Sequence, residues 1–397
     1  MASSSLFLSP STFTALASYG PDLTLSLLVL PLFLLLGLLV PTSADRLYRR
    51  ALFGSSIILV VTVLLLASVL ALPTGFRATL VLPLLPSLPF AALPLSFGLD
   101  GLSLPFILLT SLFLHLTLFS LSPSTPRLRE ALSALIFLAW ATFGTFLSRD
   151  LLAFFLFFEA SLLPIYLLVL LWGSRERRAR ASLRIALYTL FGSIFRFFNL
   201  LYLSAKTGTT DYDLLLQLSL HEEDQRFLWG TFFIAFAAKI PLVPLHLWLP
   251  EAHVEAPTVG SVLLAALLLK LGTYGIVRFS LPLFPEGTVY FAPIVTTLAI
   301  VGVIYTALTA RRQVDLKKII AYSSVGHRNV VLIGRRAGTS EGLQGALFQR
   351  ISHGIVSGAL FFAVGSIYER YGVRSLHYFG GLAHLYPMLT IRSEERR

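Results

Sequence analysis

Apolar residues dominate this chain in long runs that recur along almost its whole length, with short polar segments between them. Many runs approach the roughly 20 residues that an α-helix needs to cross the hydrocarbon core of a membrane. A bilayer offers the backbone no hydrogen-bond partners, so such runs favour membrane-spanning helices. The pattern predicts eleven spans, at about residues 24–40, 51–72, 102–122, 128–148, 150–172, 182–205, 228–249, 257–280, 289–309, 315–334 and 343–368.

The polar segments between the predicted spans differ in charge. Segments after odd-numbered spans are basic, as in Arg175–Arg180 and Arg311–Lys318, whereas Asp211–Asp224 after span six is acidic. Short basic loops stay on the cytoplasmic or matrix side of a membrane, which places the N-terminus on the opposite side. Arg335 and Arg336 break this pattern.

Composition agrees with a polytopic helical membrane protein. The chain is 56% hydrophobic and 13% charged, with a mean hydropathy of +0.79, which is too apolar for a soluble domain. A net charge of +11 suggests nucleic acid, but the basic residues lie mostly in short loops, so we expect a lipid bilayer and no nucleic acid as partner. The absence of cysteine excludes disulfides, thiolate metal sites and iron–sulfur ligation in this chain. The first apolar run follows no basic segment, so we expect a span there and not a cleaved signal peptide.

Three ionisable residues lie inside predicted spans: Glu159, Lys239 and Lys270. Such groups cost several kcal/mol in the bilayer interior, about 3 or more at its centre, and usually mark ion or proton pathways. A glutamate and a lysine that can separate act as a proton switch, because the lysine tends to release its proton when the pair parts. We expect Glu159 to partner Lys239; the alternative is a static ion pair used for packing.

Prolines predict a break in span seven. Pro241 and Pro244 follow Lys239 directly, and each removes a backbone donor and clashes with the preceding turn. We expect the helix to end just after Lys239. Broken helices at this depth are how many transporters build ion sites.

Histidines extend the candidate site. His327 and His353 fall in spans ten and eleven, where an imidazole can accept a proton on one nitrogen and donate from the other; the alternative is a hydrogen-bonded core role. Tyr322, Ser323 and Ser324 add polar groups beside His327. A solvated loop at the end of span seven is the expected setting of four further residues, His246, Glu251, His253 and Glu255. Asp100, just before span three, is a candidate helix cap.

The residues around the break resemble a family signature. The run AKIPLVPLHLWLPEAHVEAP at 238–257 is similar to NADH dehydrogenase subunit four, the antiporter-like membrane subunit of respiratory complex I. Further motifs match in order over roughly residues 95–388: FGLDGLSLPFILLT, FFEASLLPIYLLV, LWGSRERRARA, LLLKLGTYGIVRF, DLKKIIAYSSVGH and ISHGIVSGALFF.

The resemblance implies an all-α antiporter-like fold with two inverted five-helix repeats. We expect spans one to three over 1–127, a first repeat over 128–280 with its broken helix at 239–250, a partial second repeat over 289–390, and a charged tail at 391–397. It implies that Glu159, Lys239, Lys270, His327 and His353 relay protons along a central hydrophilic axis. This chain would hold no redox cofactor; NADH, FMN, iron–sulfur clusters and ubiquinone would belong to partner subunits, both membrane and peripheral.

Two departures from the family pattern stand out. The family continues with three more spans, including a second broken helix, so the second repeat is expected to be incomplete here. In addition, arginine stands at 196, 328, 335 and 350, where the family usually has methionine, and the chain has only two methionines. Arg196 and Arg350 lie in apolar stretches without an obvious acidic neighbour, so we hypothesise that one arginine codon is read as methionine or that transcripts are edited; the alternative is contact with lipid headgroups or partner helices.

The sequence therefore predicts a proton-translocating subunit of NADH:ubiquinone oxidoreductase in the mitochondrial inner membrane, with a plastid or bacterial origin as the alternative. Two other functions stay open: a cation/proton antiporter subunit of the same fold, and a truncated, non-pumping scaffold.

Overall fold

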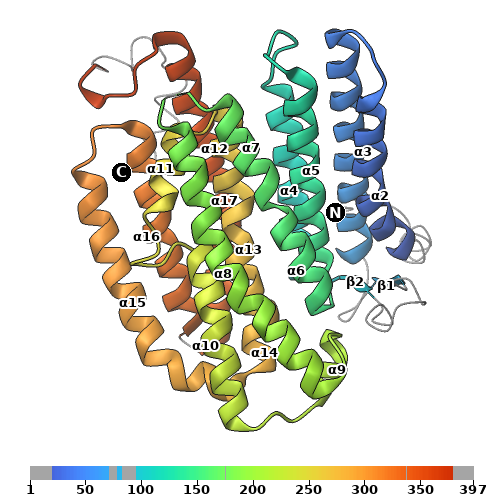
Figure 1. The fold of residues 1–397 in the computed structure, drawn as a ribbon, viewed down its shortest axis with the longest axis vertical. Helices are drawn as coiled ribbons and strands as arrows, with labels where there is room; N and C mark the ends of the chain where they lie inside the picture. Colours follow the sequence, from blue (N-terminus) through green and yellow to red (C-terminus); the bar gives the residue numbers. More distant parts are fainter. Residues whose placement is uncertain (1–19, 71–77, 83–94, 175, 337, 379–397) are drawn as a thin grey trace, which may run out of the picture.

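The computed structural model describes residues 20–70, 78–82, 95–174, 176–336 and 338–378. The predicted charged tail and the start of the chain lie outside these residues. Helices stand side by side in one bundle, with α2 and α3 at one edge and α15 and α16 at the other (Figure 1). The helices and strands are α2 Gly20–Leu39, α3 Ala44–Leu70, β1 Ala78–Leu82, β2 Leu95–Leu99, α4 Leu104–Phe119, α5 Leu128–Leu147, α6 Leu151–Ala160, α7 Leu162–Trp172, α8 Arg178–Thr207, α9 Tyr212–Gln217, α10 Glu222–Lys239, α11 Trp248–Glu255, α12 Thr258–Leu263, η1 Leu264–Leu268, α13 Leu269–Gly275, η2 Ile276–Ser280, α14 Leu281–Leu283, α15 Pro285–Arg311, α16 Leu316–Arg336, α17 Ser340–Tyr371 and η3 Leu376–Tyr378.

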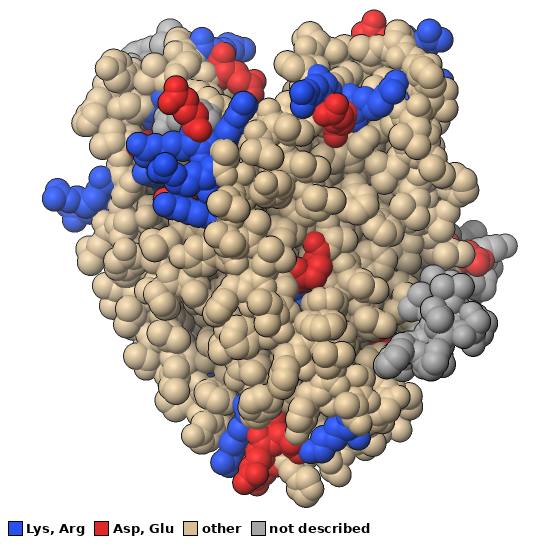
Figure 2. All heavy atoms as spheres, in the orientation of Figure 1, with Lys and Arg blue, Asp and Glu red and all other residues tan. Residues whose placement is uncertain are grey.

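A helix occupies each of the eleven predicted spans. Among the described residues, eight helical stretches are long and apolar enough to cross a membrane. Three predicted spans fall short of that measure: α4 has 16 residues, span seven is divided between α10 and α11, and α16 carries too many basic and polar residues. Charged side chains gather at the two ends of the molecule, and the broad band between them is almost free of them (Figure 2). This distribution is that of a polytopic membrane protein.

Loops that the charge pattern assigns to one side of the membrane do meet at one end of the bundle. Arg374, after span eleven, donates hydrogen bonds to Val254 O and to Ser174 Oγ, which follows span five. At the other end, Thr210 Oγ1 donates to Asp150 Oδ2 at 2.5 Å, joining the loops after spans six and four. Burial raises the pKa of Asp150, although the Thr210 hydrogen bond opposes the shift.

Two of the connections between membrane helices contain regular secondary structure. Within the proline-rich segment 73–101, β1 and β2 pair in an antiparallel hairpin. In the segment 206–226, the short helix α9 begins after Asp211, whose carboxylate accepts backbone hydrogen bonds from Asp213 and Leu214. Asp100 accepts a hydrogen bond from Ser103 N at 2.9 Å just before α4, but the N-cap of this helix is Ser103, so the predicted cap at Asp100 is wrong.

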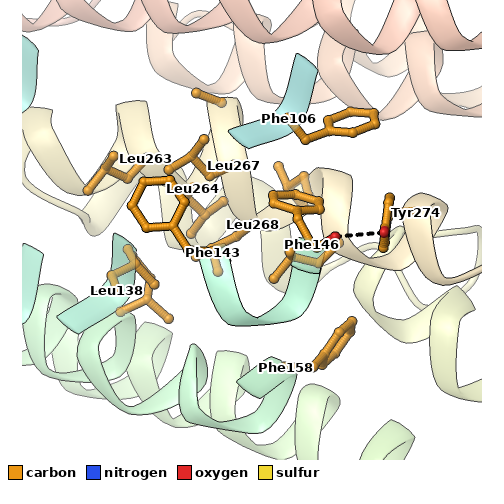
Figure 3. Close-up of a cluster of buried hydrophobic side chains, with 14 of the residues drawn as sticks. Phe106, Leu138, Phe143, Phe146, Phe158, Leu263, Leu264, Leu267, Leu268 and Tyr274 are labelled. Atoms are coloured by element: carbon orange, nitrogen blue, oxygen red, sulfur yellow. Dashed lines mark hydrogen bonds between the residues drawn. The ribbon is translucent and has the colours of Figure 1, made fainter. Parts of the chain in front are cut away.

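Aromatic and aliphatic side chains form the core where α4 and α5 meet the helix from Thr258 to Leu283 (Figure 3). Phe106 stacks on Phe146 with a centroid distance of 5.2 Å. The Tyr274 hydroxyl donates to Phe146 O at 2.8 Å, so its polar end is satisfied inside the apolar core. This stretch of helix is entirely buried within the protein, and it holds Lys270 at the centre of the bundle.

Candidate functional site

The break in span seven lies where the prolines predict it. Helix α10 ends at Lys239, and α11 begins at Trp248 after a non-helical segment. The segment frees carbonyl groups that a continuous helix would pair. Trp248 Nε1 donates to one of them, Ala238 O, at 2.9 Å. The break therefore fixes Lys239 at a helix end inside the protein, where its side chain is 4% exposed.

Glu159 does not pair with Lys239, as the sequence suggested, but with Arg196 of α8. The Ser193 hydroxyl adds a hydrogen bond of 2.6 Å to Glu159 Oε2. The expectation that Arg196 lacks an acidic neighbour is therefore wrong. Glu159 lies on α6 and Arg196 on α8, with α7 between them in the chain, so their sequence separation hid the pairing. We call Glu159, Ser193, Arg196 and Lys239 the acidic cluster.

A phenylalanine ring connects the two cations of the acidic cluster. The guanidinium carbon of Arg196 lies 3.7 Å from the centroid of the Phe158 ring, and Lys239 Nζ lies 4.9 Å from it. Both positions are within the range of cation–π attraction. Lys239 thus contacts Phe158, the residue next to Glu159 in the chain. The Glu159 carboxylate itself is paired with Arg196.

Lys270, His327 and His353, three of the five residues that the resemblance placed on one hydrophilic axis, lie together, and we call them the imidazole cluster. Lys270 Nζ lies 3.2 Å from His353 Nδ1, and the rings of His353 and His327 are 5.6 Å apart. Lys270 also donates to Ala265 O at 2.5 Å. That carbonyl belongs to the π-helical segment η1, a distortion often found at functional sites.

The two histidines differ in their surroundings. His353 is 8% exposed and lies beside Ser357, whose hydroxyl is 3.5 Å from Nδ1. His327 is exposed on the described part of the chain and contacts Gln349 Nε2 at 3.2 Å. A cavity of about 10 Å³, room for about one water molecule, lies among the three members of the imidazole cluster. The cluster thus runs from the bundle centre outward.

The prediction of a solvated loop at the end of span seven is wrong for three residues. His246, His253 and Glu255 are only 3%, 0% and 5% exposed, because α11 turns back into the bundle after the break. His253 stacks on Phe361 with a centroid distance of 4.4 Å, and within the described residues neither of its ring nitrogens has a hydrogen-bond partner. Glu251 is partly exposed, as expected, but it lies in helix α11 and not in a loop, and it is paired with Arg184.

Lys317 is a further buried cation, although the sequence analysis assigned it to a basic loop. Counted among the basic loop residues, it is in fact 1% exposed. Its Nζ donates to Ala256 O at 3.0 Å and to Ser261 Oγ at 3.3 Å, and the Ser261 hydroxyl contacts His253 O at 3.0 Å. The sequence signal for this burial lay on the other side of the contact. Apolar residues flank α11, and small residues such as Ala256 and Ser261 follow it and leave room for the Lys317 side chain.

The arginines at the four unusual positions are largely enclosed. Arg196, Arg328 and Arg350 are between 3% and 5% exposed, and Nη1 of Arg335 is also buried. Arg328 donates to Ser324 Oγ at 2.8 Å, while Arg350 lies over the Phe106 ring at 5.1 Å. Across the described residues, Arg328 Nη1 and Arg350 Nε and Nη2 lack hydrogen-bond partners. An unpaired buried charge of this kind is costly.

Asp100 forms an ion pair with Arg278, a residue 178 positions away. Burial on its own would raise the pKa of Asp100, but Arg278 and the hydrogen bonds from Ser103 lower it. No group of three or more histidine and acidic residues that could hold a metal ion occurs in the parts of the chain that the structure covers.

Comparison with known proteins gives one consistent picture. A family model described as NADH:quinone oxidoreductase/Mrp antiporter, transmembrane, matches residues 148–392. The chain is 45% identical over 304 residues to NADH-ubiquinone oxidoreductase chain 4 of Marchantia polymorpha, covering 76% of this chain and 61% of that protein. The corresponding protein of Arabidopsis thaliana is 46% identical over 301 residues, with the same coverage. The chain thus spans about three fifths of the length of these relatives.

Two solved structures share the fold. A chain of respiratory complex I from Thermus thermophilus with bound NADH superposes with a TM-score of 0.82 at 32% sequence identity, covering 93% of this chain and 76% of that one. A chain of an archaeal membrane-bound sulfane sulfur reductase superposes with a TM-score of 0.81, covering 94% and 76%. At 21% identity, this second likeness concerns the fold alone.

Proposed function

The chain belongs to the family of NADH:quinone oxidoreductase and Mrp antiporter transmembrane proteins, and we propose that it is a proton-translocating subunit of a complex I-type NADH:ubiquinone oxidoreductase. The observation that carries the proposal is the contact of Lys270 with His353, continued outward by His327. A buried amine in hydrogen-bond reach of an imidazole can pass a proton, and few other roles require that pair in the middle of a membrane bundle.

The geometry of the imidazole cluster supports a proposed route for proton transfer. The Lys270 ammonium donates its proton to an unprotonated Nδ1 of His353, which becomes an imidazolium. That imidazolium releases the proton from its other nitrogen, toward His327, directly or through a water molecule in the small cavity. Lys270 returns to its charged form by taking up a new proton.

The acidic cluster would supply or retain that proton. Lys239 and Lys270 share no direct hydrogen bond within the described residues, so transfer between them needs water or a movement of side chains. Helices α10 and α13 pack closely: a methyl group placed on Gly272 would lie 2.9 Å from Ile240 and 3.3 Å from Phe236 O. We propose Glu159, Lys239, Lys270, His327 and His353 as the relay.

Quinone reduction would drive the relay from elsewhere. NADH, FMN, iron–sulfur clusters and ubiquinone would be bound by partner subunits, and the mitochondrial inner membrane would be the location; the likeness to NADH-ubiquinone oxidoreductase chain 4 of two plants supports this. Helices over 128–280 would form one five-helix repeat and those over 289–390 part of a second.

Replacement of Lys239 by alanine tests the proposal in the assembled complex. We expect proton pumping coupled to NADH oxidation to fall by at least about tenfold, since a relay that loses a proton carrier loses its acid–base catalysis. Lys206→Ala is the matched control, because Lys206 is partly exposed and paired with Asp224 at the end of α8.

Unchanged turnover and pumping in Lys239→Ala would mean that the pumping role is wrong. If less complex assembles but the complex that does assemble pumps normally, the chain is a non-pumping scaffold. A chain that purifies apart from any NADH oxidation but exchanges cations for protons would be an antiporter.

A further inference from the structure

A large open cavity lies at the basic end of the bundle, apart from both clusters. Its volume is about 670 Å³, and its walls come from the end of α7, the start of α8, the end of α11 and Lys318 of α16. Lys and Arg side chains gather on this face near α11 and α12 (Figures 1 and 2). The relay described above does not use this space.

Basic side chains outnumber acidic ones in the cavity wall. Five basic and three acidic residues line it. Two of the basic ones are already engaged: Arg184 pairs with Glu251, and Arg178 donates to the carbonyls of Leu171 and Gly173. Among the described residues, the remaining three, Arg177, Arg180 and Lys318, form no ion pair, although Glu176 and Glu255 also line the cavity.

These three cations suit a phosphate group. Arginine presents a planar fork of donors that matches phosphate oxygens, and lysine adds a compact charge. Basic pockets at this side of a membrane protein bind anionic headgroups, with a contribution of about 1 kcal/mol for each cation near the surface. The cavity volume is large enough for a headgroup and its water.

An apolar stripe continues from the cavity along α8. Leu183, Leu187, Leu190 and Ile194 are between 50% and 67% exposed. Their spacing of three and four residues places them on one face of the helix, starting one turn after Arg180. A free phosphate ion would make no contact with this apolar stripe, whereas the acyl chains of a lipid would cover it.

We propose that this cavity binds the phosphate headgroup of an anionic phospholipid, whose acyl chains lie on the stripe of α8. Arg177, Arg180 and Lys318 hold the phosphate, and the stripe selects a lipid over a soluble anion. The inference rests on the membrane location of the chain and does not depend on proton translocation.

The test uses the native membrane complex that contains the full chain, stripped of lipid and placed in nanodiscs of phosphatidylcholine. A diazirine-labelled phosphatidylglycerol is added, and its cross-links are mapped by peptide mass spectrometry. We expect cross-links within residues 183–194. Arg177→Gln/Arg180→Gln should weaken this labelling by about tenfold or more, given two lost cations.

The matched control is Arg311→Gln/Arg312→Gln, since these two residues are exposed after α15 and do not line the cavity. The control should label like the unaltered complex, and neutral lipid should compete poorly with both. Equal labelling of the Arg177/Arg180 variant and the control would overturn the proposal, as would cross-links confined to other helices.

A second variant separates a lipid from a free phosphate. Leu187→Gln/Leu190→Gln keeps the cations and alters the stripe, so it should bind the lipid more weakly and still assemble. If millimolar inorganic phosphate displaces the probe completely and the leucine changes have no effect, the site binds a soluble anion and the lipid assignment is wrong. Protection of the cavity by an acidic segment of a partner protein would also contradict it.

Discussion

The acidic cluster and the imidazole cluster both accommodate a buried lysine, but with different neighbouring groups. Each holds a lysine with almost no exposure in the interior of a membrane protein. In the acidic cluster a carboxylate is present, but it is shared with a second cation, Arg196. In the imidazole cluster no carboxylate lines the small cavity, and Lys270 instead contacts a backbone carbonyl and a histidine.

The difference concerns which cluster can release a proton. A cation next to a carboxylate is stabilised in its charged form, whereas a carbonyl and a neutral imidazole compensate burial less completely. The carboxylate of the acidic cluster therefore holds Arg196 in its charged form, while the imidazole cluster is suited to passing a proton on. Changes in the two clusters should have separable effects.

The largest effect on function is expected from Lys270→Ala. It removes the proton donor to His353, so pumping should fall by about a hundredfold, the lower end of what a positioned acid or base contributes. Proton uptake by vesicles that contain the complex measures this. Lys206→Ala is again the control, because it removes a partly exposed lysine at the end of α8 that is paired with Asp224. If Lys270→Ala pumps normally, the imidazole cluster is not the relay.

Glu159→Gln should weaken the protein itself as well as its function. With arginine at 196, the change leaves the guanidinium buried without its partner, which costs about 3 kcal/mol or more. We expect less assembled complex on a native gel and reduced pumping by what remains.

The double variant Glu159→Gln/Arg196→Met separates these two effects. It removes both charges, so assembly should return while pumping stays low. Pumping that returns with assembly would show that the pair only supports packing, contrary to the proposed role of Glu159.

The arginines at 196, 328, 335 and 350 give a direct test of the decoding hypothesis. We expect peptide mass spectrometry of the native chain, with a protease that does not cleave at arginine, to find methionine at these positions. Methionine would leave Glu159 free to approach Lys239 and would remove two cations from the wall of the small cavity. Arginine at all four would disprove the hypothesis and leave Arg328 and Arg350 as costly buried charges.

The smallest effect is expected from Ser193→Ala. This change removes one hydrogen bond to the Glu159 carboxylate and leaves the Arg196 pair in place. A hydrogen bond to a charged group contributes about 1.5–3 kcal/mol, so assembly should persist and pumping should fall a few-fold. Ser204→Ala, a serine near the exposed end of α8, serves as the control. A loss as large as that of Glu159→Gln would mean that the serine, not the arginine, positions the carboxylate.

The sequence by itself determined the features that depend on local chemistry. Runs of apolar residues predicted where the helices lie. A run of this length can cross the hydrocarbon core of a bilayer, and only a helix then pairs all of its backbone groups. Pro241 and Pro244 predicted the end of a helix after Lys239, because proline has no backbone N–H to donate and its ring clashes with the preceding turn. The spacing of charged loops assigned the ends of the bundle at which residues such as Ser174 and Arg374 meet.

Only the tertiary structure decided which distant residues meet. Glu159 pairs with Arg196 and not with Lys239, and His253, Glu255 and Lys317 are buried where the sequence suggested solvent. Partner choice depends on the rotation and depth at which α6, α8, α10 and α11 pack against one another. Helix packing in a membrane is set by many small van der Waals contacts and a few polar ones spread over distant segments, and no short stretch of sequence contains that information.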